Sequence, residues 1–127
     1  MIYGQCLCGK VKYIYRAHLE ESILCFCKHC QLAQGGVMAW NSAIDQSKFE
    51  LITGGEILKS YFHTPLKARV FCGECASPIY SYRKDLPNII RLRLGTVTQG
   101  QIPSPNQSFY HQYQPAFIEI KGVKTFN

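Results

Sequence analysis

The chain has 127 residues, of which 46% are hydrophobic and 13% aromatic, and its formal net charge is +6. This composition supplies enough apolar side chains for a folded core and excludes a disordered chain. The sequence has no apolar stretch of membrane-spanning length and no linker, repeat or low-complexity segment, so we expect one domain over residues 1–127 without membrane association.

Most of the chain shows the two-residue periodicity of β-strands, interrupted by turn residues such as Gly54-Gly55. Only residues 28–34 are typical of a helix, and the following Gly35-Gly36 predicts where that helix ends. The sequence therefore predicts an all-β fold with one short helical turn. The expected strands, in chain order, cover residues 10–16, 23–26, 37–43, 49–53, 58–62, 68–71, 78–82, 90–94 and 117–120.

Seven cysteines fall into three short groups, and their spacing favours zinc sites. Cys6 and Cys8 form a C-x-C pair, whose side chains share one face if the segment is an extended strand. Cys72 and Cys75 form a C-x-x-C turn, in which Gly73 allows the tight turn that aims two thiolates at one point. The simplest partition is a closed site of four thiolates, which would hold the N-terminal segment against a segment about half the chain away.

The remaining cysteines, Cys25, Cys27 and Cys30, lie close together in sequence. A tetrahedral ion with three protein ligands keeps one position for water or substrate, so this group is the candidate reactive site. His29 is poorly placed as a fourth ligand because it lies between two of the proposed ligands. A surface or hydrogen-bonded role is commoner for the other histidines, but they stay possible as a fourth ligand: His18, His63 and His111.

A disulfide framework and buried free thiols are the competing interpretations of the cysteines. An odd number of cysteines cannot pair completely, and a chain of this length does not need disulfides to form a core. The first ten residues lack the pattern of a secretory signal, so we expect a reducing, cytoplasmic location. In that location clustered cysteines are more often metal ligands than disulfides.

Metal would also change the charge of the chain. A zinc site of four thiolates carries −2 and one of three thiolates carries −1, so the formal charge falls from +6 to about +3. The basic residues form no block of five or more, and Arg91 and Arg93 alternate with apolar residues. This pattern favours solvated strand faces over a nucleic-acid-binding surface, and a small acidic ligand is easier to accommodate.

Several motifs resemble those of one known family. The opening segment, residues 4–13, reads G-Q-C-L-C-G-K-V-K-Y, and residues 25–30 read C-F-C-K-H-C before Gly35-Gly36. Residues 71–75 read F-C-G-E-C, residues 94–97 read L-G-T-V, and residues 115–120 read P-A-F-I-E-I. In this order and spacing, the motifs resemble the glutathione-dependent formaldehyde-activating enzyme family, which also includes centromere protein V, over essentially the whole chain.

The resemblance implies a β-tent fold, in which small antiparallel sheets are clamped by zinc. It implies two zinc ions per chain, a structural ion and a second, exchangeable and reactive ion. The resemblance places the structural ion on Cys6, Cys8, Cys72 and Cys75, and the second ion on Cys25, Cys27 and Cys30. It also implies a carbon-sulfur lyase that joins glutathione to formaldehyde and gives S-hydroxymethylglutathione.

Three positions depart from the family pattern. Phe26 occupies a position where histidine or another small or polar residue is common, Ala76 follows the last cysteine where glycine is usual, and Phe117 stands near a common tryptophan. None of these changes removes a proposed ligand. Trp40 and Lys28 are candidates for the pocket wall, although a core tryptophan and a solvated lysine are the commoner roles.

Two functional hypotheses follow from the sequence. The first is a zinc-dependent carbon-sulfur lyase-like enzyme that joins glutathione or a related thiol to formaldehyde or another small aldehyde, with Cys25, Cys27 and Cys30 at the reactive site. The second is a non-enzymatic β-module, stapled by zinc, that binds a protein or nucleic-acid partner. A long basic or proline-rich extension would favour a centromere-type role, and the chain has none.

Overall fold

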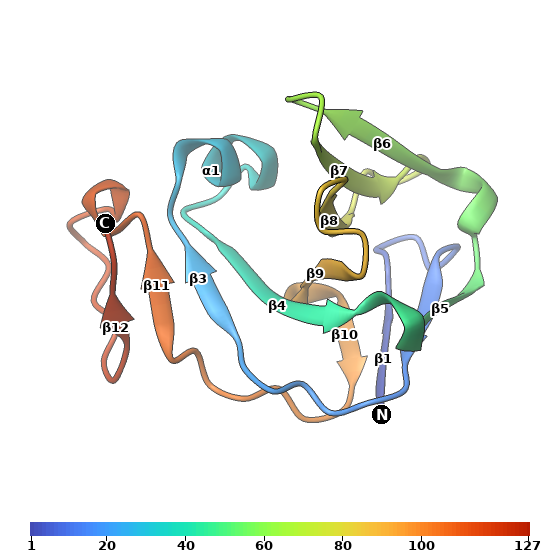
Figure 1. Ribbon diagram of the computed structural model, residues 1–127, viewed down its shortest axis with the longest axis horizontal. Coiled ribbons are helices and arrows are strands. Elements are labelled where there is room, and N and C mark those ends of the chain that lie inside the picture. Colours follow the sequence, from blue (N-terminus) through green and yellow to red (C-terminus); the bar gives the residue numbers. More distant parts are fainter.

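The computed structural model describes residues 1–127 and consists mainly of two β-sheets (Figure 1). The four-stranded sheet has the order β10 (Val97–Gln99), β1 (Ile2–Gln5), β2 (Lys12–Tyr15) and β5 (Phe49–Thr53). The eight-stranded sheet has the order β12 (Lys124–Thr125), β11 (Gln107–Phe109), β3 (Ile23–Cys25), β4 (Ala39–Asp45), β9 (Ile89–Arg93), β8 (Pro78–Arg83), β7 (Lys67–Cys72) and β6 (Leu58–Phe62). All strand pairs are antiparallel except those of β11 with β3 and with β12.

One α-helix, α1 (Lys28–Gln34), follows β3 on the side of the sheet away from β1 (Figure 1). The Cys27 side chain caps its N-terminus, and Gly35 ends it in the left-handed conformation with a φ of 63°. The remaining helical segments are single 3₁₀ turns: η1 (Gln46–Lys48), η2 (Gly55–Ile57), η3 (Leu94–Thr96) and η4 (His111–Tyr113). No helix combines the length and the hydrophobicity needed to cross a membrane.

The prediction of an all-β fold with one short helix is confirmed, and eight of the nine predicted strands coincide with observed ones. The strand predicted at residues 117–120 is wrong. The Ile118 N–H closes a turn onto the Pro115 carbonyl, and Phe117 is 81% exposed. The backbone therefore closes on itself in a turn here, and the segment pairs with no strand of either sheet. The sequence did not predict four strands, which have only two to four residues each: β1, β10, β11 and β12.

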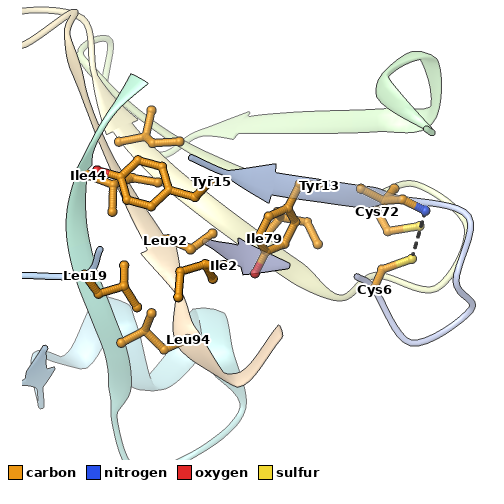
Figure 2. Close-up of a cluster of buried hydrophobic side chains, with 12 residues drawn as sticks. Ile2, Cys6, Tyr13, Tyr15, Leu19, Ile44, Cys72, Ile79, Leu92 and Leu94 are labelled. Atoms are coloured by element: carbon orange, nitrogen blue, oxygen red, sulfur yellow. Dashed lines mark hydrogen bonds between the residues drawn. The ribbon is translucent and has the colours of Figure 1, made fainter. Parts of the chain in front are cut away.

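The hydrophobic core lies between the two sheets (Figure 2). From the four-stranded sheet, Ile2 and Tyr13 contribute side chains that are at most 2% exposed. From the eight-stranded sheet, Ile90 and Leu92 of β9 point into the same core. Because side chains alternate along a strand, the residues between and after them in β9 point to the opposite face of the sheet. One face of the large sheet is therefore apolar, and the other carries the polar residues described below.

The turn between β5 and η2 offers a matched pair of substitutions. Gly54 has a φ of +83°, and a Cβ there would overlap the Lys10 carbonyl and lie 2.8 Å from the Val11 Cα. Gly55 has an ordinary φ, and its nearest neighbour would be the Leu51 Cδ1 at 3.6 Å. We expect Gly54→Ala to lower the free energy of unfolding by at least about 2 kcal/mol, because it adds strain and a backbone clash. Gly55→Ala should change it by less than about 0.5 kcal/mol, and equal effects in denaturant titrations would contradict this account.

Candidate functional site

The first cysteine group joins two segments that are distant in sequence. Cys6 and Cys8 lie in the turn after β1, while Cys72 ends β7 and Cys75 lies in the following turn. The four sulfurs lie within 4.8 Å of one another. The Cys6–Cys8 sulfur separation is 3.5 Å and the Cys8–Cys72 separation is 3.8 Å. Four thiolates around a tetrahedral zinc ion would have sulfurs about 3.8 Å apart, so this donor set fits zinc.

The local structure of the first pair differs from the expectation. Cys6 and Cys8 do not lie on a strand, because β1 ends at Gln5 and the chain turns at Leu7. The two sulfurs converge because the turn folds back, with the Gly9 N–H donating to the Cys6 carbonyl at 3.1 Å. The C-x-C spacing therefore brings the thiols together through a turn.

Polar groups surround the sulfurs of this four-cysteine cluster. The Val11 N–H donates to the Cys6 sulfur at 3.3 Å, and the Glu74 N–H donates to the Cys72 sulfur at 3.4 Å. The hydroxyl of Ser77 lies 3.2 Å from the Cys75 sulfur and lowers the pKa of the Cys75 thiol to about 5. Such hydrogen bonds stabilise thiolates, which are the form that binds metal. In Figure 2, Cys6 and Cys72 lie together at one end of the core.

The second group, which we call the three-cysteine cluster, is formed by one short segment. Cys25 ends β3, Cys27 caps α1, and Cys30 lies on the first turn of α1, with all three sulfurs within 4.8 Å of one another. The Cys25 and Cys30 sulfurs are 3.4 Å apart, and the Cys30 N–H donates to the Cys27 sulfur at 3.3 Å. The cluster contains three thiols and no histidine. It fits a zinc ion that keeps one coordination position for another ligand.

Histidines lie near this cluster but not in it. The rings of His29 and His63 are 5.1 Å apart, and both residues line the cavity described next. His18 and His111, which the sequence left possible as ligands, lie outside that cavity.

The three-cysteine cluster opens into a cavity of about 920 Å³ on the polar face of the eight-stranded sheet. This volume lies within the range of about 300–1,000 Å³ that is usual for ligand sites. The walls come from α1, β3, β4, β7, β8, β9 and β11 (Figure 1), so segments between residues 21 and 113 meet there. Lys28 lies in its lining as expected, whereas Trp40 packs against the core and Phe26 is fully buried.

The cavity gathers cationic side chains that the sequence appeared to scatter. Six cationic residues line it: Lys28, Lys67, Arg69, Arg83, Arg91 and Arg93. Only two carboxylates do so, and one of them, Asp85, is paired with Arg83 at 2.9 Å. The expectation that Arg91 and Arg93 lie on a solvated strand face is wrong for Arg93, which is 5% exposed. Burial lowers the pKa of Arg93 to about 10, so its guanidinium stays charged at neutral pH.

Two guanidinium groups influence the three-cysteine cluster. The Arg69 Nη2 lies 3.9 Å from the Cys30 sulfur, and the charge of Cys30 also acts on Arg93. The hydrogen bond with Cys25 lowers the pKa of the Cys30 thiol to about 4, with Arg69 adding to the effect, while the same hydrogen bond raises the pKa of Cys25. The cluster is therefore built to carry negative charge on sulfur.

The sequence did not identify these arginines as site residues. The alternation of Arg91 and Arg93 with Leu92 showed that they share one face of a strand. Which face is buried depends on tertiary contacts with segments distant in sequence, such as the bond of Arg93 to Gln34 of α1. That information is absent from the local pattern.

Comparisons with known proteins agree with the geometry. The family model described as "Glutathione-dependent formaldehyde-activating enzyme" matches residues 1–113. The crystal structure of a Rhodobacter sphaeroides protein, determined in structural genomics, has the same fold, with a TM-score of 0.63 and 22% sequence identity. The match covers 80% of this chain and 97% of that protein. No curated protein sequence gives a significant match.

The two cysteine groups should respond differently to substitution. Cys72 is fully buried and joins distant segments, so Cys72→Ala should remove one bound metal ion and lower the free energy of unfolding by more than about 4 kcal/mol. Cys27→Ala changes a half-exposed ligand from a local segment, so it should remove one ion and leave the thermal transition nearly unchanged. Elemental analysis and circular dichroism give the two readouts. A Cys72→Ala protein that melts like the wild type would contradict the assignment.

The turn after Cys75 offers a stabilising substitution. Ala76 has a φ of 66°, a left-handed conformation that is unfavourable for residues other than glycine, and its N–H donates to the Cys72 carbonyl at 2.8 Å. Ala76→Gly removes this strain but increases the entropy of the unfolded chain. The expected net result is a stabilisation of up to about 1 kcal/mol in denaturant titrations with the metal bound. A loss of stability would show that the turn is not strained.

Proposed function

Since the chain belongs to the glutathione-dependent formaldehyde-activating enzyme family, we propose that it joins glutathione, or a related thiol, to formaldehyde or another small aldehyde. The product is an S-hydroxymethyl adduct, and the activity is of the carbon-sulfur lyase type. The observation that carries this proposal is the convergence of Cys25, Cys27 and Cys30 at the edge of a cationic cavity.

The proposal includes two zinc ions per chain. Cys6, Cys8, Cys72 and Cys75 would hold a structural ion, and Cys25, Cys27 and Cys30 would hold a second, exchangeable one. At the second site zinc would supply a fourth coordination position that accepts a substrate thiol and favours its thiolate form. The spacing of the sulfurs supports both assignments, and neither cluster contains a carboxylate, the ligand that calcium and magnesium prefer.

The overall reaction is balanced without an oxidant or reductant. The sulfur of the thiol forms a bond to the aldehyde carbon while the carbon–oxygen π bond breaks. The proton lost by the thiol ends on the aldehyde oxygen, which becomes a hydroxyl group. The chain therefore has to favour the thiolate, place it beside the aldehyde and hold the rest of the thiol substrate.

Side chains of the cavity are suited to these tasks. Arg69 lies beside the Cys30 sulfur and favours negative charge at the cluster. A second guanidinium, that of Arg93, lies in the cavity wall without a carboxylate partner. Glutathione carries two carboxylates, and a cavity of about 920 Å³ is large enough for a tripeptide. Charge and volume therefore both support an acidic peptide thiol as the substrate.

The non-enzymatic β-module is the second candidate, and one observation bears on it. The three thiols of the second site come from residues 25–30, so a thiol ligand could displace the ion instead of reacting beside it. The cationic residues gather inside a cavity, which supports a small acidic ligand over nucleic acid. We also propose a cytoplasmic location, because clustered cysteines that bind metal are typical of a reducing compartment.

Adduct formation can be measured by exchange NMR of glutathione with formaldehyde. We expect the zinc-loaded protein to raise the exchange rate above the uncatalysed rate. Cys27→Ala should reduce this increase at least about 100-fold, because it removes one of the three thiolate ligands. Leu32→Ala is the matched control, since Leu32 lies on the same helix, is 79% exposed and does not line the cavity.

Native mass spectrometry separates the two candidates. The enzyme is supported if each chain holds two ions, if glutathione binds to one of them or releases it, and if the exchange is catalysed. If glutathione releases an ion but the rate of adduct exchange does not rise, the protein only exchanges ligands and is not an enzyme for this reaction. Equal exchange rates with and without protein would reject the enzymatic proposal.

A further inference from the structure

The floor of the cavity contains a buried amide without a hydrogen-bond partner. Asn41 lies on β4, is 4% exposed and lines the cavity beside the three-cysteine cluster. Its side-chain oxygen is buried and makes no hydrogen bond. Buried polar groups are almost always paired, because an unpaired group loses its hydration without compensation. An unpaired amide in a cavity floor is therefore a candidate ligand contact.

The residue directly opposite Asn41 in the sheet is Arg93 of β9. The Arg93 Nε donates to the Gln34 side chain at 3.3 Å, and its Nη1 donates to the Arg91 carbonyl at 3.1 Å. A guanidinium has five N–H donors, so several remain free to bind a ligand. Arg93 is only 5% exposed, yet no carboxylate pairs with its guanidinium. A buried, unpaired charge is costly unless a ligand or a nearby anion compensates it.

The three-cysteine cluster compensates only part of the positive charge. The cavity is lined by six cationic side chains and two carboxylates, Glu21 and Asp85. A zinc-loaded cluster of three thiolates adds one negative charge. Three positive charges therefore stay uncompensated in a partly enclosed space, where electrostatic interactions are stronger than in bulk water.

We propose that Asn41 and Arg93, with Arg91 beside them, form a subsite that binds an amide and a carboxylate of a peptide-like thiol. Arg93 and Arg91 supply planar, charged donors for the carboxylate, and the Asn41 amide can both donate to and accept from a peptide group. This inference rests on the proposed function, because it assigns the part of the substrate that does not react. The subsite would make the cavity select acidic peptide thiols over small neutral thiols.

A purely structural role for Arg93 is the main alternative. Its bond to Gln34 ties β9 to the end of α1, the helix that carries Cys30. Gln34→Ala removes this tie and leaves the guanidinium in place. It therefore distinguishes an arginine that holds the helix from one that binds a ligand.

The test uses S-methylglutathione, which keeps both carboxylates and both peptide groups but has no free thiol to bind metal. Isothermal titration calorimetry with the zinc-loaded protein should detect binding that weakens as salt is added. Asn41→Ala, Arg91→Met and Arg93→Met should each weaken binding at least 10-fold. Arg16→Met is the matched control, because Arg16 is exposed, pairs with Glu50 and lies outside the cavity, and it should leave the affinity unchanged.

The outcomes keep this inference separate from the proposed function. Binding of the probe that the cavity variants weaken supports the subsite, whether or not adduct formation is catalysed. Absence of binding to the wild type at millimolar probe overturns the subsite, even if catalysis is found. Gln34→Ala binding as weakly as Arg93→Met would also overturn the role of Arg93, and if Arg93→Met does not fold, Asn41→Ala and Arg91→Met decide the question.

Discussion

The convergence of four cysteine sulfurs from two distant segments is the constraint on which the rest of the structure depends. Cys8 and Cys72 are separated by 64 positions, yet their sulfurs lie 3.8 Å apart. This contact fixes the end of β1, in the four-stranded sheet, against the end of β7, in the eight-stranded sheet. A chain of 127 residues has a modest core, so a metal-held junction between its sheets adds stability where apolar burial is limited.

The relation between the sheets then determines where ligands can bind. Ile90 and Leu92 of β9 pack into the core, and the period of two in the strand turns Arg91 and Arg93 to the opposite face. The register of strand pairing places Asn41 of β4 opposite Arg93, so the neighbouring strand also has a core face and a cavity face. Core and cavity are thus two faces of one sheet. A shift of one residue in β9 would place arginines in the core and leucines in the cavity.

The sequence predicted the elements and cysteine groups better than it predicted the cavity. Strong alternation and turn glycines located most strands and the end of α1 at Gly35, because both signals are local. Strands such as β12, with two residues, exist only through pairing with β11 and leave no periodic signal. The segment at residues 117–120 showed the reverse case, since its apolar content suggested a strand where the chain forms a turn.

The electrostatics of the cavity were the least predictable feature. Burial of Arg93 and the lack of a partner for the Asn41 side-chain oxygen depend on how several strands and α1 close around them. By contrast, the C-x-C-x-x-C spacing of the second site needs no tertiary information, because Cys25, Cys27 and Cys30 meet across one strand end and one helical turn. Locality also explains why the two sites differ in role. Ligands from distant segments come together only when the chain folds, so metal binding at the first site is linked to stability. A site built by six consecutive residues can exchange its ion or ligand while the sheets stay assembled.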